Sequence, residues 1–126
     1  MQQRARRHLS RLRQTLVQLK DQPGHLLPIF LEDSPMVKGN VYPLRRKCGK
    51  AYCRCVEGQP HVTLVHSTNV EGRTRLWTVP KERIEELHLL TGRYRRFRSA
   101  RAKFVKLYVA MLRTINAIEQ VRKKEP

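Results

Sequence analysis

Three cysteines and a histidine are concentrated in one short stretch of this chain. Cys48, Cys53, Cys55 and His61 form the pattern Cys-x4-Cys-x-Cys-x5-His, and no cysteine occurs elsewhere. Three thiolates and one imidazole make the ligand set of a closed structural zinc site. A metal of this kind stabilises a domain too small to build a large hydrophobic core. The sequence therefore predicts one structural Zn²⁺ per chain and a compact knuckle around it.

Two alternatives to this ligand set stay open. His66 lies five residues beyond His61 and is the alternative fourth ligand. The three cysteines could also be buried as small hydrophobic side chains without a metal. An odd number of cysteines argues against a disulfide framework. Four protein ligands leave no open position for the water of a catalytic zinc, so a catalytic metal is not expected.

The cysteine stretch also resembles a family of small bacterial proteins described as a domain of unknown function. The family signature is Cys-Gly-Lys-x-x-Cys-x-Cys-x-x-Gly-x-x-His, and the resemblance covers about residues 36 to 112. The matching residues are Cys48, Gly49, Lys50, Cys53, Cys55, Gly58 and His61, with further similarity at Gly39, Val79-Pro80 and Tyr94 to Phe97. After His61 the chain has Val62-Thr63-Leu64 where the family has Gly-Pro-Tyr. The resemblance implies an architecture and no particular activity.

Positive charge restricts the partners of this chain. It has 27 Lys and Arg residues against 10 Asp and Glu residues, a formal net charge of +17. Arginine outnumbers lysine 18 to 9, and arginine suits bidentate phosphate contacts and stacking on bases. The excess recurs in separate segments, which favours a nucleic acid over a merely solvated surface or an anionic membrane. The predicted nucleic-acid-binding residues are Arg4, Arg7, Arg11, Arg45, Arg46, Lys47, Lys50, Arg54, Arg73, Arg75, Trp77, Arg93, Arg95, Arg96 and Arg98.

Residues 1–21 are predicted to form a basic N-terminal helix. The apolar residues Ala5, Leu9, Leu12, Leu16 and Leu19 recur at steps of four and three, the spacing of a helix that packs on another helix. No acidic residue precedes Asp21, so the arginines of this helix require an outside anion. Residues 22–35 contain three prolines, which are expected to prevent a continuous helix and to make this segment a connector.

Residues 36–80 are predicted to form a head of strands around the knuckle. Residues 36–44 indicate a strand interrupted near Gly39, and residues 62–79 indicate a hairpin with a loop of about four residues closed by Gly72. These segments predict a three-stranded antiparallel sheet. Arg73, Arg75 and Trp77 alternate with other residues and so share one face. Trp77 is either a core residue or a platform on which a base stacks.

Residues 81–126 are predicted to form a long basic amphipathic helix that begins after Pro80. Thr91-Gly92 is the most favourable place for a kink. The predicted stripe consists of Leu87, Leu90, Tyr94, Phe97, Phe104, Tyr108, Met111, Ile115 and Ile118, with Arg101 as one cationic interruption. A heptad stripe of this length needs a partner helix, either the N-terminal helix or another copy of the chain.

The predicted fold is α+β: a zinc knuckle and a three-stranded antiparallel sheet, flanked by an N-terminal helix and a long C-terminal heptad helix. We expect a non-enzymatic accessory protein that clamps or positions structured RNA or DNA beside a partner enzyme, with RNA slightly favoured. The sequence shows no nucleophile–base pair, carboxylate pair or phosphate-binding glycine loop. The alternative is a zinc-stabilised protein–protein adaptor that acts through its heptad helices. Reduced cysteines, no secretory signal and no apolar run that could cross a membrane predict a cytoplasmic protein.

Overall fold

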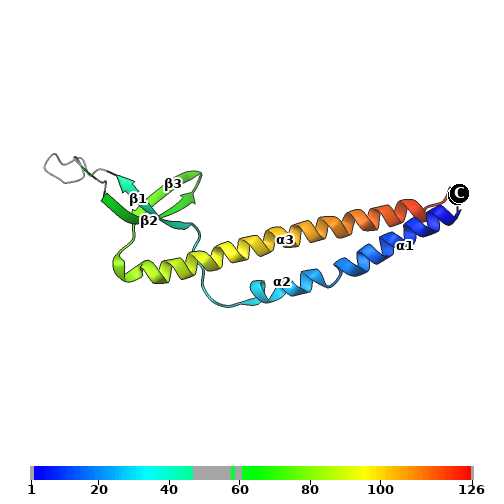
Figure 1. Ribbon diagram of the computed structural model, residues 1–126, viewed down its shortest axis with the longest axis horizontal. Coiled ribbons are helices and arrows are strands. Elements are labelled where there is room, and N and C mark those ends of the chain that lie inside the picture. Colours follow the sequence, from blue (N-terminus) through cyan, green and yellow to red (C-terminus); the bar gives the residue numbers. More distant parts are fainter. Residues whose placement is uncertain (1, 47–57, 59–60, 126) are drawn as a thin grey trace. The chain divides into compact units, whose positions relative to one another are not determined.

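The computed structural model describes residues 2–46, 58 and 61–125 and has the predicted α+β class. Figure 1 follows the elements along the chain. They are α1 (Gln2–Leu19), α2 (Gln22–Leu31), β1 (Asn40–Arg46), β2 (His61–Val70), β3 (Arg73–Thr78), the single 3-10 turn η2 (Lys81–Arg83) and α3 (Ile84–Arg122). The chain divides into two compact units. The sheet unit is residues 34–96, and the helical unit is residues 1–33 together with 97–126.

The sheet unit contains the predicted three-stranded antiparallel sheet, in the order β1-β2-β3. The loop of the hairpin is shorter than predicted, because β2 continues to Val70 and β3 begins at Arg73. Glu71 and Gly72 alone make the turn, with φ of 53° and 80°. Two successive residues with positive φ give the turn whose twist matches that of the two strands. The strands therefore pair up to the turn itself.

The core of the sheet unit lies where the sheet, the segment before it and the first turns of α3 meet. Val65, Val79, Leu87 and Thr91 are buried. The Val37 amide donates to the Leu90 carbonyl at 3.1 Å, which fixes the segment before β1 to the helix. The Thr91 hydroxyl donates to the Leu87 carbonyl at 2.7 Å, so its buried oxygen has a partner within the helix.

The long helix continues through Thr91-Gly92, the predicted position of a kink. α3 is continuous from Ile84 to Arg122. Gly92 has no positive φ, and it lies in a helical stretch between buried Thr91 and partly buried Arg93. A glycine inside a helix costs about 1 kcal/mol relative to alanine. Packing of the residues on either side of Gly92 offsets this cost.

Residues 22–35 contradict the prediction of a connector, because α2 is a helix from Gln22 to Leu31. Pro23 lies in the first helical turn, where its missing N–H has no partner to lose. Pro28 is inside the helix and removes one hydrogen bond. The compensation is packing: the ring of Phe30 lies edge-to-face with Phe97 at 5.3 Å and with Phe104 at 6.1 Å.

The helical unit packs α1 and α2 along α3 in part as predicted. Leu9, Leu12, Leu16 and Leu19 of α1 are partly buried, whereas Ala5 is exposed. On α3 the side chains turned toward α1 and α2 recur at steps of three and four, and we call them the seam. The seam residues are Phe97, Ala100, Phe104, Leu107, Met111, Thr114, Ile118 and Val121.

The seam corrects three positions of the predicted stripe. Tyr108 and Ile115 lie outside it and are 60% and 47% exposed. The predicted interruption at Arg101 does not exist, because Ala100 occupies that level and is 3% exposed. The predicted stripe is defined by large apolar residues. It omits small residues such as Ala100, although they allow a neighbouring helix to come closest. The seam therefore keeps Phe97, Phe104, Met111 and Ile118, replaces each intervening predicted position by the residue before it, and is continuous.

Candidate nucleic-acid interface

One face of the sheet carries three arginines and the only tryptophan of the chain. Paired residues of adjacent strands lie on the same face, and Trp77 pairs with His66, Arg75 with Thr68, and Arg45 with Val62. Alternation then places Arg73 there as well. Arg45, Arg73, Arg75 and Trp77 are all exposed, and we call them the sheet face. The predicted grouping of Arg73, Arg75 and Trp77 is confirmed, and the strand register adds Arg45.

Hydrogen bonds fix the orientation of Trp77. Its indole N–H donates to Nδ1 of His66 at 2.6 Å, and Nε2 of His66 lies 2.9 Å from the carbonyl oxygen of Lys38. Because Nδ1 accepts, the proton of the imidazole is on Nε2 and is donated to Lys38. His66 is 4% exposed, whereas Trp77 is 38% exposed. The polar edge of the indole is thus tied to the interior while part of the ring stays accessible.

These contacts bear on the alternative zinc ligand. Both ring nitrogens of His66 already have hydrogen-bond partners inside the sheet unit. The backbone of His61 begins β2 and pairs with that of Arg46. Among the residues that the structure describes, no three His, Cys, Asp or Glu side chains gather as a metal site. The predicted ligands and cations outside the described residues are Cys48, Cys53, Cys55, Lys47, Lys50 and Arg54.

Arg83 extends the sheet face in a way that the sequence did not indicate. Its guanidinium carbon lies 5.9 Å from the centre of the Trp77 ring, and its Nε lies 3.4 Å from a carboxylate oxygen of Glu86. A guanidinium at this distance attracts the negative face of an indole ring. The position of Arg83 depends on the path of the chain through η2, between β3 and α3.

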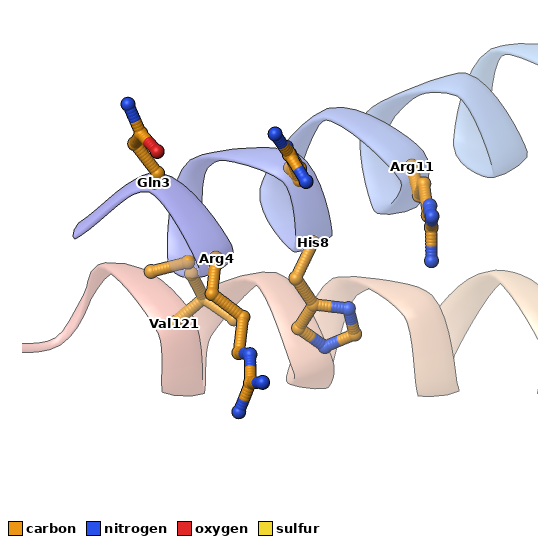
Figure 2. A pocket seen from close by; sticks show the side chains of 7 residues that line it. Gln3, Arg4, His8, Arg11 and Val121 are labelled. Atoms are coloured by element: carbon orange, nitrogen blue, oxygen red, sulfur yellow. The ribbon is translucent and has the colours of Figure 1, made fainter. Parts of the chain in front are cut away.

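The helical unit has a basic surface of its own, shown in Figure 2. An open groove is lined by Gln3, Arg4, Ala5, Arg7, His8 and Arg11 of α1 and by Val121 of α3. Arg4, His8 and Arg11 extend from α1 toward the side of α3 in this view. Their spacing of four and three places them on one side of the helix. We call Arg4, Arg7, His8 and Arg11 the α1 cluster.

The cations of the α1 cluster have no neutralising neighbour within their helix. α1 contains no acidic residue, and in the described part of the chain none of its arginines forms an ion pair. The predicted residues Arg4, Arg7 and Arg11 all line this groove. His8 was missed, although its position between Arg4 and Arg11 at helical spacing was a usable signal.

Comparison with known proteins adds a family but no activity. Residues 3–88 match the protein family described as domain of unknown function DUF6788. The chain belongs to this family. No match was found among curated proteins or among solved structures. The matched residues include nearly all of α1, α2, the sheet and the first turn of α3, whereas the resemblance in the sequence covers about residues 36 to 112.

The DUF6788 region contains the sheet face and the α1 cluster, but it ends before the predicted arginines of α3. Among these arginines, Nη1 of Arg93 donates to the carbonyl of Pro35 at 3.2 Å, and Arg96 also has a partner. Arg95, Arg96 and Arg98 are exposed. None of the described helices is long and apolar enough to cross a membrane.

Proposed function

We propose that this protein is a nucleic-acid-binding accessory protein and that its sheet face contacts the ligand. The observation that supports this most directly is the setting of Trp77. Its ring is oriented by a buried histidine, partly exposed, and accompanied on the same face by Arg45, Arg73 and Arg75. Aromatic rings stack on bases, and arginines bind phosphates and stack on bases in turn. A tryptophan with only a packing role in the core would have its ring covered by other side chains.

Unpaired bases are the part of a nucleic acid that this face suits. Stacking on Trp77 requires a base whose face is free, and such bases occur in the loops and bulges of structured RNA. The sheet face lies on a three-stranded antiparallel sheet and offers no helix that would enter a major groove. We therefore favour RNA over duplex DNA. The α1 cluster is a second basic surface, within the helical unit, that would contact phosphates in its own right.

The proposal includes a structural Zn²⁺ held by Cys48, Cys53, Cys55 and His61. Its support is the sequence pattern together with the hydrogen bonds that already occupy His66. The role is binding without catalysis, so a partner enzyme would perform any reaction on the nucleic acid. The metal would fix the chain between β1 and β2, and thereby the strand that carries Arg45.

The test uses the fluorescence of the single tryptophan. Because the chain has one tryptophan, its emission reports the sheet face alone. We expect an RNA hairpin with a loop of uridines to quench this emission, and the matching RNA duplex without a loop to quench it less. Trp77→Leu should weaken binding of the hairpin by about 1 to 3 kcal/mol, the contribution of one base–aromatic stack, as measured by polarisation of labelled RNA.

A charge variant separates phosphate contacts from stacking. Arg73→Gln combined with Arg75→Gln should reduce the salt dependence of log affinity by about 1.4 units, since each single-strand phosphate contact contributes about 0.7. The matched control is Arg113→Gln with Arg122→Gln, which removes the same charge from the helical unit. If the RNA bound saturably but left the tryptophan emission unchanged, the sheet face would not be the binding site. Failure of hairpin and duplex to bind at low salt would contradict the function itself.

A further inference from the structure

α3 carries a second apolar stripe beside the seam. Val105, Tyr108, Leu112 and Ile115 recur at steps of three, four and three, with Val109 next to them. All five are between 36% and 60% exposed. We call these five residues the outer stripe. Val105, Tyr108, Leu112 and Ile115 each follow a seam residue by one position. The outer stripe therefore lies about 100° further round the helix than the seam.

The two flanks of the seam differ in a way that indicates a partner. In a hairpin of two packed helices both flanks face water, and polar residues are expected on both. The outer stripe occupies one flank with valine, leucine, isoleucine and tyrosine. The other flank has Lys103, Lys106, Ala110, Arg113 and Ala117. The described residues leave at least 36% of each outer-stripe residue exposed, and a contiguous exposed patch of large apolar side chains marks an interaction site.

The charges around the outer stripe indicate whether its partner is acidic or basic. Arg98 and Arg101 precede it, Arg122 follows it, and Glu119 is the single acidic residue between positions 97 and 122. The whole helical unit has 14 Lys and Arg residues against 5 Asp and Glu residues. A second copy of this chain would bring the same excess of positive charge to the interface and would be repelled. An acidic partner would be attracted.

The spacing of the outer stripe selects the shape of the partner. Steps of three and four match the packing of side chains between two helices, as they do in the seam. The stripe from Val105 to Ile115 is about 15 Å long, or three helical turns. A helix that lies on a lipid surface presents a broad apolar face, whereas this stripe is narrow and belongs to a helix whose seam is already packed. Tyr108 is 60% exposed, and its hydroxyl can donate to a carboxylate at the edge of the contact.

We propose that the outer stripe of α3 docks an acidic amphipathic helix of a partner protein. This helix would be the third member of a bundle with α1–α2 and α3, its apolar side chains on the outer stripe and its carboxylates near Arg101 and Arg122. The surface is separate from the sheet face, so the inference does not depend on the proposed nucleic-acid binding.

The probe is a synthetic helical peptide of about three heptads with leucine at positions a and d and mainly glutamate elsewhere. A control peptide has the same composition with the leucines moved out of heptad spacing, and therefore the same charge. Binding of each labelled peptide to the full-length protein is measured by fluorescence polarisation. We expect the heptad peptide to bind at least tenfold more tightly than the control peptide.

Matched variants locate the contact. Leu112→Lys with Ile115→Lys should abolish the preference for the heptad peptide, even though two added lysines attract an acidic peptide more strongly. Ser99→Lys with Gln120→Lys adds the same charge outside the stripe and should leave the preference intact. Far-UV circular dichroism checks the fold of both variants. Tyr108→Gln is a milder second variant and should reduce the preference by at least threefold.

Several outcomes would overturn the proposal. Equal affinity for the two peptides would show that charge alone attracts them. A preference that survives both stripe variants would place the contact elsewhere. Self-association of the wild type that Leu112→Lys abolishes would assign the stripe to a second copy of the chain. Binding to vesicles with anionic lipid that the same variant abolishes, without a preference for the heptad peptide, would assign it to a membrane surface.

Discussion

Among single Gly→Ala substitutions in the sheet unit, Gly39→Ala should be the most destabilising. Gly39 has φ of +118°, a conformation that L side chains rarely adopt. A Cβ atom there would lie 2.6 Å from Nε2 of His66 and would also collide with the backbone oxygen of Ser67. The close approach serves a purpose, because it brings the carbonyl of Lys38 to the His66 ring that orients Trp77.

The size of the effect follows from two contributions. A residue held in a sparsely populated backbone region costs about 1 to 3 kcal/mol. The collision with Ser67 involves backbone on both sides, so the chain before β1 must move, and the hydrogen bond between His66 and Lys38 is lost at about 1 kcal/mol. We therefore expect Gly39→Ala to reduce the free energy of unfolding of the sheet unit by about 2 to 4 kcal/mol.

Two other glycines of the same unit separate these contributions. Gly72 has φ of +80°, and a methyl group added to it would meet no atom within 4 Å. Gly72→Ala should therefore show the backbone cost alone, about 1 to 2 kcal/mol. Gly92 is helical, and its Cβ would meet only a nitrogen of Arg95 at 3.9 Å. Gly92→Ala should stabilise the unit by about 0.5 to 1 kcal/mol.

The assay is urea unfolding followed by the emission of Trp77, which lies in the same unit as all three glycines. The expected order of stability is Gly92→Ala, wild type, Gly72→Ala and Gly39→Ala. If Gly39→Ala and Gly72→Ala were equally stable, the close approach to β2 would be wrong. If Gly39→Ala unfolded like the wild type, the positive φ at this residue would be wrong as well.

Three further results are expected. Leu107→Glu places a carboxylate in the seam and should destabilise the helical unit by about 2 to 3 kcal/mol. Tyr108→Glu, one residue later, should change the stability of that unit by less than about 1 kcal/mol. Melting is followed by far-UV circular dichroism, and the opposite order of stability would refute the seam. Phe30→Ala removes both edge-to-face contacts and should cost about 2 to 4 kcal/mol in the same measurement, and a wild-type melt would show that α2 does not depend on this packing. Elemental analysis should find one zinc per chain and none after Cys53→Ser, and metal-free wild-type protein prepared without chelator would disprove the zinc site.

The sequence alone determined the features that depend on local preferences. Alternation along the strands placed Arg73, Arg75 and Trp77 on one face, and the leucines of α1 marked the side of that helix that packs. Gly72 located the hairpin turn because positive φ is inexpensive only for glycine. These preferences act over a few residues, so each can be read from the chain without knowledge of its neighbours in space.

Tertiary structure decided every choice between local alternatives of similar energy. α3 has two apolar stripes one residue apart, and the one that is buried includes Ala100 and Thr114, whose small size matters only once α1 and α2 approach. Pro28 weakens α2 by one hydrogen bond, and the aromatic contacts of Phe30 with distant residues of the chain outweigh that loss. Strand register alone set His66 opposite Trp77 and made a candidate metal ligand into the residue that orients the indole. Local preferences differ by about 1 kcal/mol or less, whereas burial of one large side chain contributes about 1.5 to 3 kcal/mol, so long-range packing settles such cases.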